Sequence, residues 1–247
     1  MDSNFDSSYY NIDYYVTLNG KKFRKDGTEY GWSYANPEGE WEGCAPICGV
    51  WKEIFNPVNS LDVGSGRGTF VTYLRDIGIE AWGFDYSNWA IQNPYVRCQK
   101  GWCIQHDATL VWPYGDSAFG LVTALDIFEH IYETDVDKVI NEMFRVSGKW
   151  VFLQIAGING GSGAVIHDNC YILKRGETAP IELEAYAVAG HVTIQTKEWW
   201  VNKLGKNMDD NNRFIFRNDL VQEFIKKVDP AVIANWVKNI ILVLERV

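Results

Sequence analysis

Short hydrophobic runs alternate with amphipathic stretches from Val58 onward. Such runs are typical of strands in a sheet that is covered on both faces. We expect strands at 58–63, 80–84, 102–106, 121–125, 150–155 and 239–246. Helical spacing of the apolar residues predicts helices at 46–55, 69–76, 89–95, 135–145, 196–204 and 219–228. Regular alternation of strands and helices predicts an α/β fold with a mostly parallel sheet and helices on both faces.

The first expected strand ends in a glycine-rich turn, Gly64-Ser65-Gly66-Arg67-Gly68, and a helix follows at once. Glycine permits positive φ and a close approach of the backbone to a ligand. The free N–H groups at the start of a helix attract negatively charged groups. The spacing G-x-G-x-G differs from the dinucleotide fingerprint G-x-G-x-x-G, and the chain has no P-loop motif. The turn therefore predicts a cradle for a nucleotide-like cofactor.

This turn resembles the first motif of class I S-adenosylmethionine (SAM)-dependent methyltransferases, in which an acidic residue, here Asp62, precedes three alternate glycines. Later motifs follow in the same order. Asp85-Tyr86 ends the next strand, where an acidic residue accepts ribose hydroxyls, although Asp85 would also suit a helix N-cap. Asp107-Ala108 follows the third strand and resembles the position that takes the adenine amino group. The whole set matches the order expected for a SAM site.

The resemblance spans roughly residues 45–155 and implies a seven-stranded, mostly parallel Rossmann-like sheet. It implies SAM as cofactor, S-adenosylhomocysteine as product, and these cofactor-binding residues: Asp62, Gly64, Ser65, Gly66, Gly68, Asp85, Tyr86, Asp107 and Ala108. We expect a single domain of 247 residues. It divides into an N-terminal cap (1–45), a SAM-binding core (46–155), a substrate-side insertion after strand five (156–205) and the C-terminal end of the sheet (206–247).

The fourth strand ends in Asp126, Glu129 and His130, with D-x-x-E-H spacing. If a helical turn follows, Asp126 and Glu129 share one face. Carboxylates and an imidazole suit a divalent metal or an acid–base pair. The pattern resembles E-x-x-E-H of metal-dependent O-methyltransferases such as the small-RNA 3′-end ribose methyltransferases. Those enzymes carry another histidine downstream, and His191 stands at the corresponding place in this chain.

Two interpretations of this cluster stay open, beside a purely structural role. In one, Asp126, His130 and His191 act directly as catalytic groups. In the other, Asp126, Glu129, His130 and His191 bind Mg²⁺ or Mn²⁺, which acidifies the acceptor oxygen.

The segment from Gly190-His191 to Trp199-Trp200 resembles one in methyltransferases encoded among glycan-modifying genes. Paired tryptophans stack on sugar faces or pack a helix against a sheet. The chain lacks the P-P motif that follows strand four in methyltransferases of DNA bases and glutamine amides. We therefore expect O-methylation of a hydroxyl on a sugar, a glycan or another small molecule. The alternatives are RNA-end ribose 2′-O-methylation and a non-catalytic SAM-binding partner subunit.

The amino-acid composition limits which binding partners and which cellular setting we expect for the protein. The net charge of −9 disfavours long nucleic acid, which needs clustered basic residues. The odd number of cysteines, 5, and the lack of a signal peptide favour a reduced, cytoplasmic setting. No apolar run approaches the roughly 20 residues of a membrane span. Aromatic residues make up 15% of the chain, and we expect part of them to surround a binding cleft.

Overall fold

The computed structural model describes residues 5–17, 43–158, 170–177, 190–209 and 213–247. Its strands are β1 (Asn59–Val63), β2 (Glu80–Asp85), β3 (Cys103–Gln105), β4 (Phe119–Leu125), β5 (Ser147–Ile155), β6 (Tyr171–Ile172), β7 (Thr193–Ile194), β8 (Phe214–Phe216) and β9 (Ile240–Arg246). Its helices are α1 (Ile12–Thr17), α2 (Cys44–Phe55), α3 (Thr69–Asp76), α4 (Asn88–Gln92), the 3₁₀ turn η1 (Phe128–His130), α5 (Glu133–Val146), α7 (Lys197–Lys206), α8 (Asn218–Lys227) and α9 (Pro230–Trp236).

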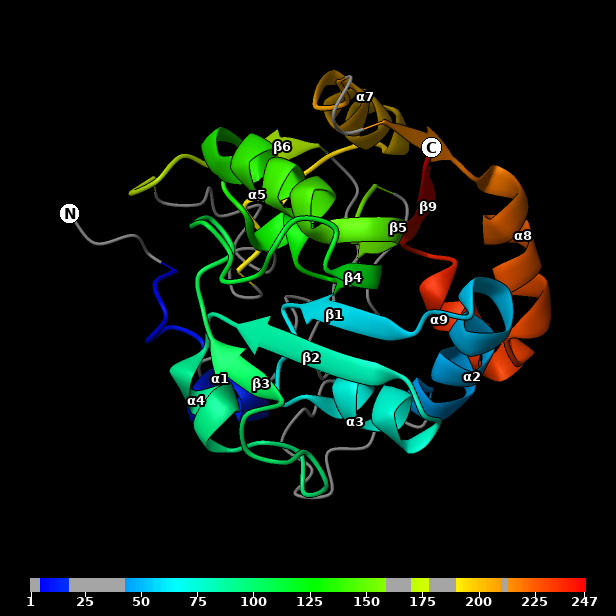
Figure 1. The fold of residues 1–247 in the computed structure, drawn as a ribbon. Coiled ribbons are helices and arrows are strands. Elements are labelled where there is room, and N and C mark those ends of the chain that lie inside the picture. The colour runs from blue at the N-terminus through cyan, green and yellow to red at the C-terminus, as the bar shows by residue number, and fades with distance from the viewer. Residues whose placement is uncertain (1–4, 18–42, 159–169, 178–189, 210–212) are drawn as a thin grey trace.

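Seven strands form the main sheet in the order β3-β2-β1-β4-β5-β9-β8 (Figure 1). Strands β1 to β5 pair in parallel, whereas β9 runs antiparallel to both β5 and β8. The predicted seven-stranded, mostly parallel sheet is therefore confirmed. Because the chain moves outward from β1 to β3 and then returns to β4, the order reverses between β1 and β4. Ligands of open α/β sheets bind at that switch point, beyond the carboxyl ends of the strands.

Helices cover both faces of the sheet, as the alternation predicts. Helices α5 and α7 pack on one face, and α2, α3, α8 and α9 pack on the other (Figure 1). The periodic apolar residues of α5 are all buried: Val136, Val139, Ile140, Met143 and Phe144. Adjacent residues of β5 serve opposite faces, since Val151 joins the α5 side and Phe152 the α2 side. This burial on both faces explains the continuous hydrophobic runs in the sequence.

The spacing of hydrophobic residues did not predict five elements of the structure: α1, β6, β7, β8 and α9. Each is short, so its apolar period is too brief to read. The predicted cap and insertion lie only partly within the described residues, because 1–4, 18–42, 159–169 and 178–189 fall outside them. In the described part of the insertion, β7 pairs with β6 in a separate two-stranded sheet. Just before β7, the Val192 N–H donates to the Glu129 carbonyl of η1 (2.8 Å).

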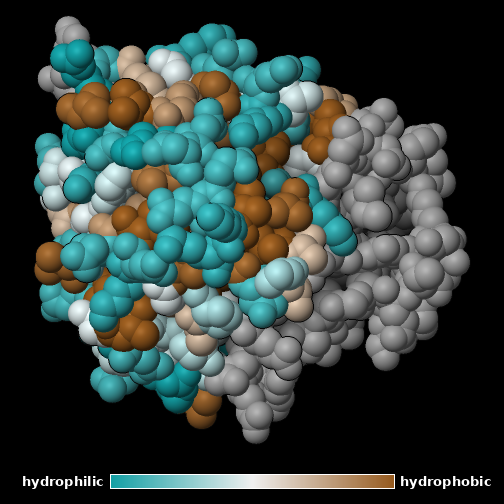
Figure 2. Space-filling view, turned by 90° about the vertical axis from the view of Figure 1, so that its right-hand side faces the viewer, coloured by the Kyte–Doolittle hydropathy of each residue, from teal (hydrophilic) through white to brown (hydrophobic). Residues whose placement is uncertain are grey.

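No helix within the described ranges combines the length and apolar character that crossing a bilayer requires. The face of the molecule that carries α8 mixes hydrophilic and hydrophobic residues (Figure 2). Scattered apolar residues of this kind are ordinary on protein surfaces.

Candidate functional site

The glycine-rich turn joins β1 to α3 in a conformation that needs glycine. Gly64, Gly66 and Gly68 have φ values of 74°, 53° and 80°. A Cβ atom at Gly64 would lie 2.9 Å from Ile127 Cδ1, so the turn packs tightly against the residues that follow β4. A Cβ atom at Gly66 would meet no atom within 4 Å. The turn thus touches the β4 side closely and presents an open face at Gly66, beside the first N–H groups of α3.

Asp85 closes the turn from the end of β2. Its Oδ2 accepts the Gly66 N–H (2.7 Å), and its Oδ1 accepts the Ser87 N–H (2.7 Å). Burial raises the pKa of this carboxyl, and the two N–H donors oppose that effect. Ser87, rather than Asp85, caps α4, because its hydroxyl accepts the Ala90 N–H (3.0 Å). A carboxylate offers about four lone-pair sites, so Asp85 retains capacity for ribose hydroxyls.

Asp62 and Ser65 lie beneath the turn. Asp62 is 3% exposed, and its Oδ1 accepts the Thr123 hydroxyl of β4 (2.7 Å). Burial raises the pKa of Asp62 to about 7. Ser65 is buried against β2, since a Cβ atom at Gly83 would lie 2.6 Å from the Ser65 Cβ. Asp62 therefore lies behind the glycine-rich turn with a pKa near neutral pH. A positively charged ligand group there would favour its ionised form.

The residues expected at the adenine end follow β3. Asp107 Oδ1 accepts both the N–H and the hydroxyl of Thr109 (2.8 Å each). Ala108 is buried, and its carbonyl accepts the indole N–H of Trp112 (2.9 Å). These local hydrogen bonds hold the loop in one shape at the same edge as Asp85.

A buried pair of carboxyls follows β4. Asp126 has φ 49°, the left-handed region that non-glycine residues seldom adopt. The carboxyls of Asp126 and Glu129 lie close enough for each to affect the pKa of the other. Asn239 donates from Nδ2 to Asp126 Oδ1 (3.0 Å), and the Ala156 N–H donates to Glu129 Oε1 (3.3 Å). Burial raises the pKa of Asp126 to about 7 and that of Glu129 well above its usual range. Burial of two neighbouring carboxyls therefore favours the protonated form of both.

His130 and His191 meet beside this pair, although the insertion separates them in the sequence. Their ring centroids are 4.8 Å apart, and the planes are nearly perpendicular. His130 Nδ1 lies 3.1 Å from the Gly190 carbonyl, which can only accept, so Nδ1 carries the proton and Nε2 has the lone pair. Burial lowers the pKa of His130 to about 4. At neutral pH the imidazole is uncharged and can accept a proton at Nε2.

Tyr10 reaches the same point from the N-terminal segment and was missed in the sequence. Its hydroxyl lies 3.4 Å from His130 Nδ1, and the Ser87 hydroxyl donates to the Tyr10 carbonyl. Its ring lies 6.4 Å from that of Tyr86. A Cβ atom at Gly190 would lie 2.8 Å from the Tyr10 oxygen. The tyrosine-rich composition of residues 5–17 was the available signal, but only the fold brings Tyr10 to His130.

Three of the four predicted metal ligands gather within ligand distance. The donor atoms of Glu129, His130 and His191 all lie within 4.8 Å of one another. Asp126 does not join this group, and its Oδ1 accepts a hydrogen bond from Asn239 instead. Glu129 Oε2 is buried and receives no hydrogen bond from a donor group. A carboxylate and two imidazoles are a ligand set that divalent transition metals accept.

The two tryptophans of α7 have different surroundings. Trp200 is fully buried, and its ring centroid lies 5.7 Å from that of Phe128. Trp199 is partly buried, with the Lys203 ammonium 5.6 Å from its ring. Trp200 therefore packs α7 against the core. Of the two alternatives for the tryptophan pair, stacking on a sugar is wrong for Trp200, and packing against the core is right.

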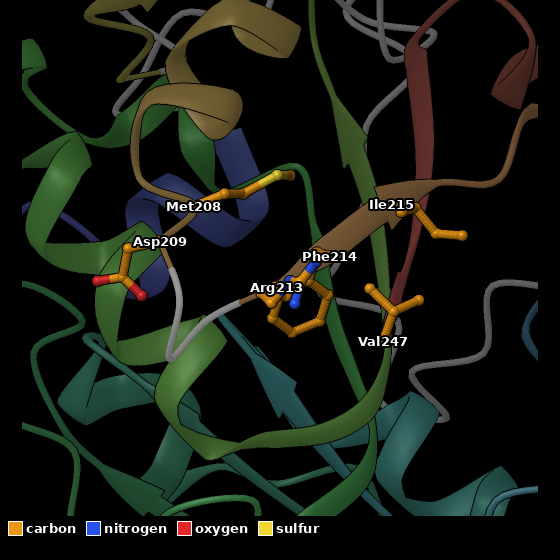
Figure 3. A pocket seen from close by; sticks show the side chains of 6 residues that line it. All are labelled: Met208, Asp209, Arg213, Phe214, Ile215 and Val247. Carbon is orange, nitrogen blue, oxygen red and sulfur yellow. The ribbon is translucent and has the colours of Figure 1, made fainter.

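A surface depression lies at the opposite edge of the sheet (Figure 3). Its lining residues are Met208, Asp209, Arg213, Phe214, Ile215 and Val247. Phe214 pairs with Arg246 at the start of β8, and Arg246 donates to the Ser147 carbonyl at the start of β5. This is the amino edge of the parallel strands, so the depression is remote from the glycine-rich turn.

Comparison with known proteins agrees with the motifs. A family profile described as "Methyltransferase domain" matches residues 61–150. No curated protein matches the sequence significantly. The structure is similar to the 4+2 cyclase SpnF, with 13% identity, a TM-score of 0.52 and coverage of 98% of this chain and 97% of that one.

It is also similar to phosphoethanolamine N-methyltransferase 2 of Haemonchus contortus in complex with SAM, with 15% identity and a TM-score of 0.51. That match covers 93% of this chain and 59% of the other. At such low identity these two likenesses establish the fold alone. The matched domain includes the glycine-rich turn, Asp85 and Asp126, on a sheet with the expected order. Residues 61–150 therefore match a methyltransferase domain, and they lie on the Rossmann-like fold of class I SAM-dependent methyltransferases.

Proposed function

We propose that this protein methylates a hydroxyl group of a small molecule, and that sugars and glycans are the first acceptors to test. One observation carries the proposal: an uncharged histidine, His130, is fixed at the carboxyl end of β4 with its proton on Nδ1. The available lone pair on Nε2 is the group that an acceptor hydroxyl needs when it loses its proton.

The chemistry divides between cofactor and protein. When bound, SAM supplies a methyl group on a sulfonium, which is already a strong electrophile. The turn from Gly64 to Gly68 and the Asp85 carboxylate bind and orient the cofactor. His130 Nε2 accepts the acceptor proton while the Nδ1–H bond to the Gly190 carbonyl holds the ring in place. That carbonyl and the adjoining carboxyls also favour the positive charge that develops on the imidazole.

Hydroxyl acceptors suit the surroundings of this base. The ring of Tyr10 lies 5.9 Å from that of His130 and 6.4 Å from that of Tyr86. Phenol hydroxyls both donate and accept hydrogen bonds, as sugar hydroxyls do. Trp200 no longer supports a sugar acceptor, because it is in the core. The proposal therefore rests on His130, and the neighbouring tyrosines are consistent with a hydroxyl acceptor.

A divalent metal at the same site is a second candidate. The closeness of Glu129, His130 and His191, together with the unpaired Glu129 Oε2, fits Mn²⁺ or a similar ion. Such an ion would lower the pKa of the acceptor hydroxyl. Asp126 would then hold Glu129 in place rather than act as a ligand.

Transfer of radiolabelled methyl from SAM to a panel of sugars, glycans and RNA ends tests the proposal, with SAM binding measured by calorimetry in parallel. We expect label in the hydroxyl acceptors, and loss of turnover in His130→Ala with SAM affinity kept. Label in RNA ends alone would favour ribose 2′-O-methylation. SAM binding without transfer to any acceptor would favour a non-catalytic partner subunit.

Chelation separates the two forms of the mechanism. If turnover persists in a strong chelator and falls only in His130→Ala, the histidine acts as the base. If chelator abolishes turnover and Mn²⁺ restores it, the metal candidate holds. Glu129→Gln tests the metal candidate separately, because it removes the charge of one proposed metal ligand while the side chain keeps its size.

A further inference from the structure

Two cysteine thiols lie together directly under the cofactor turn. The Sγ atoms of Cys98 and Cys103 are 3.9 Å apart. The residues between them form an exposed turn in which Gly101 has φ 90°. A disulfide needs an S–S distance of about 2.05 Å, so the sulfurs must approach each other by about 2 Å. Side-chain rotation and a small movement of the exposed turn would supply this approach.

The same sulfurs contact the glycine-rich turn. A Cβ atom at Gly68 would lie 2.5 Å from Cys98 Sγ and 2.9 Å from Cys103 Sγ. The backbone links the two segments as well, since the Tyr95 N–H donates to the Arg67 carbonyl (2.7 Å) and the Cys98 N–H donates to the Tyr95 carbonyl (2.8 Å). Any change at the thiols therefore reaches the residues that hold the cofactor.

The pair is also chemically asymmetric. The Cys103 thiol hydrogen-bonds to Cys98, which lowers the pKa of Cys98 to about 7 and raises that of Cys103 well above its usual range. The Arg75 guanidinium adds to the lowering at Cys98. The thiolate is the reactive form of cysteine. Cys98 is thus the attacking sulfur, and Cys103 is placed to resolve the product.

The other three cysteines have different surroundings. Cys44 and Cys48 are 2% and 0% exposed, and burial raises the pKa of Cys48 well above its usual range. Cys170 is exposed and not part of a disulfide. The exposed Cys170 serves as the control thiol.

We propose that Cys98 and Cys103 form a reversible disulfide that weakens SAM binding. With hydrogen peroxide as oxidant, the Cys98 thiolate attacks one peroxide oxygen and becomes a sulfenic acid, and the O–O bond breaks to release hydroxide, which takes a proton from solvent and becomes water. The Cys103 thiol then attacks the sulfenic sulfur, forms the S–S bond and releases a second water. A dithiol reductant restores both thiols. Because the sulfurs move toward each other, at least one leaves its contact with Gly68, and the turn loses that support.

The inference depends on the SAM site but not on the acceptor, and mass spectrometry tests its first step. Trypsin cleaves after Lys100, so the reduced chain yields Cys98 and Cys103 in separate peptides. After hydrogen peroxide treatment of the full chain, we expect these two peptides to be joined, and dithiothreitol to separate them. Absence of the joined peptides would overturn the proposal.

Calorimetric titration with SAM tests the second step on the same samples. We expect the oxidised chain to bind SAM about tenfold more weakly than the reduced chain. Cys98→Ser and Cys103→Ser should bind SAM equally before and after peroxide, whereas Cys170→Ser should keep the full response. A joined peptide with unchanged SAM affinity would overturn the regulatory step. If the reduced chain binds no SAM at all, the cofactor assignment fails, and the peptide result still decides the disulfide.

Discussion

Substitution of Gly68 by alanine should destabilise the protein strongly, for two separable reasons. The residue has φ 80°, a conformation that costs a non-glycine residue about 1–2 kcal/mol. The new Cβ would also lie 2.5 Å from Cys98 Sγ and 2.9 Å from Cys103 Sγ. Overpacking of a well-packed site costs about 1–3 kcal/mol. We therefore expect Gly68→Ala to lower the free energy of unfolding by about 2–5 kcal/mol.

Gly66→Ala is the matched control. Gly66 also has positive φ (53°), but its added Cβ would meet nothing within 4 Å, so only the backbone cost of about 1–2 kcal/mol applies. Urea unfolding under reducing conditions measures both values. In the Gly68→Ala background, Cys98→Ala should recover about 1 kcal/mol or more, because it removes the nearer sulfur. Equal losses for the two glycine variants, or no rescue, would refute the steric argument.

Three further outcomes are expected. His130→Ala should lower kcat by about 10²–10⁴-fold while SAM affinity measured by calorimetry stays unchanged; an equal loss of SAM affinity would contradict its role as a base. Asn239→Ala removes the donor to Asp126 and should cost about 1–3 kcal/mol in urea unfolding, and a neutral result would show that the bond is dispensable. Burial raises the pKa of Asp62 to about 7 from 3.8, so its contribution to stability is full below pH 3.8 and is lost as pH rises through 7. Asp62→Asn should therefore be more stable than the parent at pH 8, by at most about 4 kcal/mol, and this gain should shrink toward pH 4; a gain independent of pH would refute the assignment.

Local patterns predicted the parts of the site that depend on backbone shape. Helix α3 (Thr69–Asp76) begins and ends at the predicted residues. The glycines of the preceding turn all have positive φ, which their spacing indicated. Helix α4 is shorter than expected and ends at Gln92, because Asn93 follows and Pro94 then lacks an N–H. The spacing of apolar residues therefore predicted where these helices lie, but it predicted the end of only one of the two correctly.

Local sequence patterns could not predict the side-chain contacts that give the site its chemistry. Tyr10 meets His130 across 120 positions, and Asn239 meets Asp126 across 113. No local pattern specifies either pair. The placement of Trp200 in the core, and the departure of Asp126 from the three gathered metal donors, also depend on how α7 and η1 pack.

The sequence by itself determined the strand–helix alternation, the glycine turn and the order of the acidic residues. These features are set by spacing along the chain: hydrophobic period, turn chemistry and helix starts act over a few residues. Only the tertiary structure decided that Cys98 and Cys103 lie under Gly68, and that His130 is buried, uncharged and faced by Tyr10 and His191. Burial and proximity between distant segments shift a pKa, and both arise only when the elements pack together.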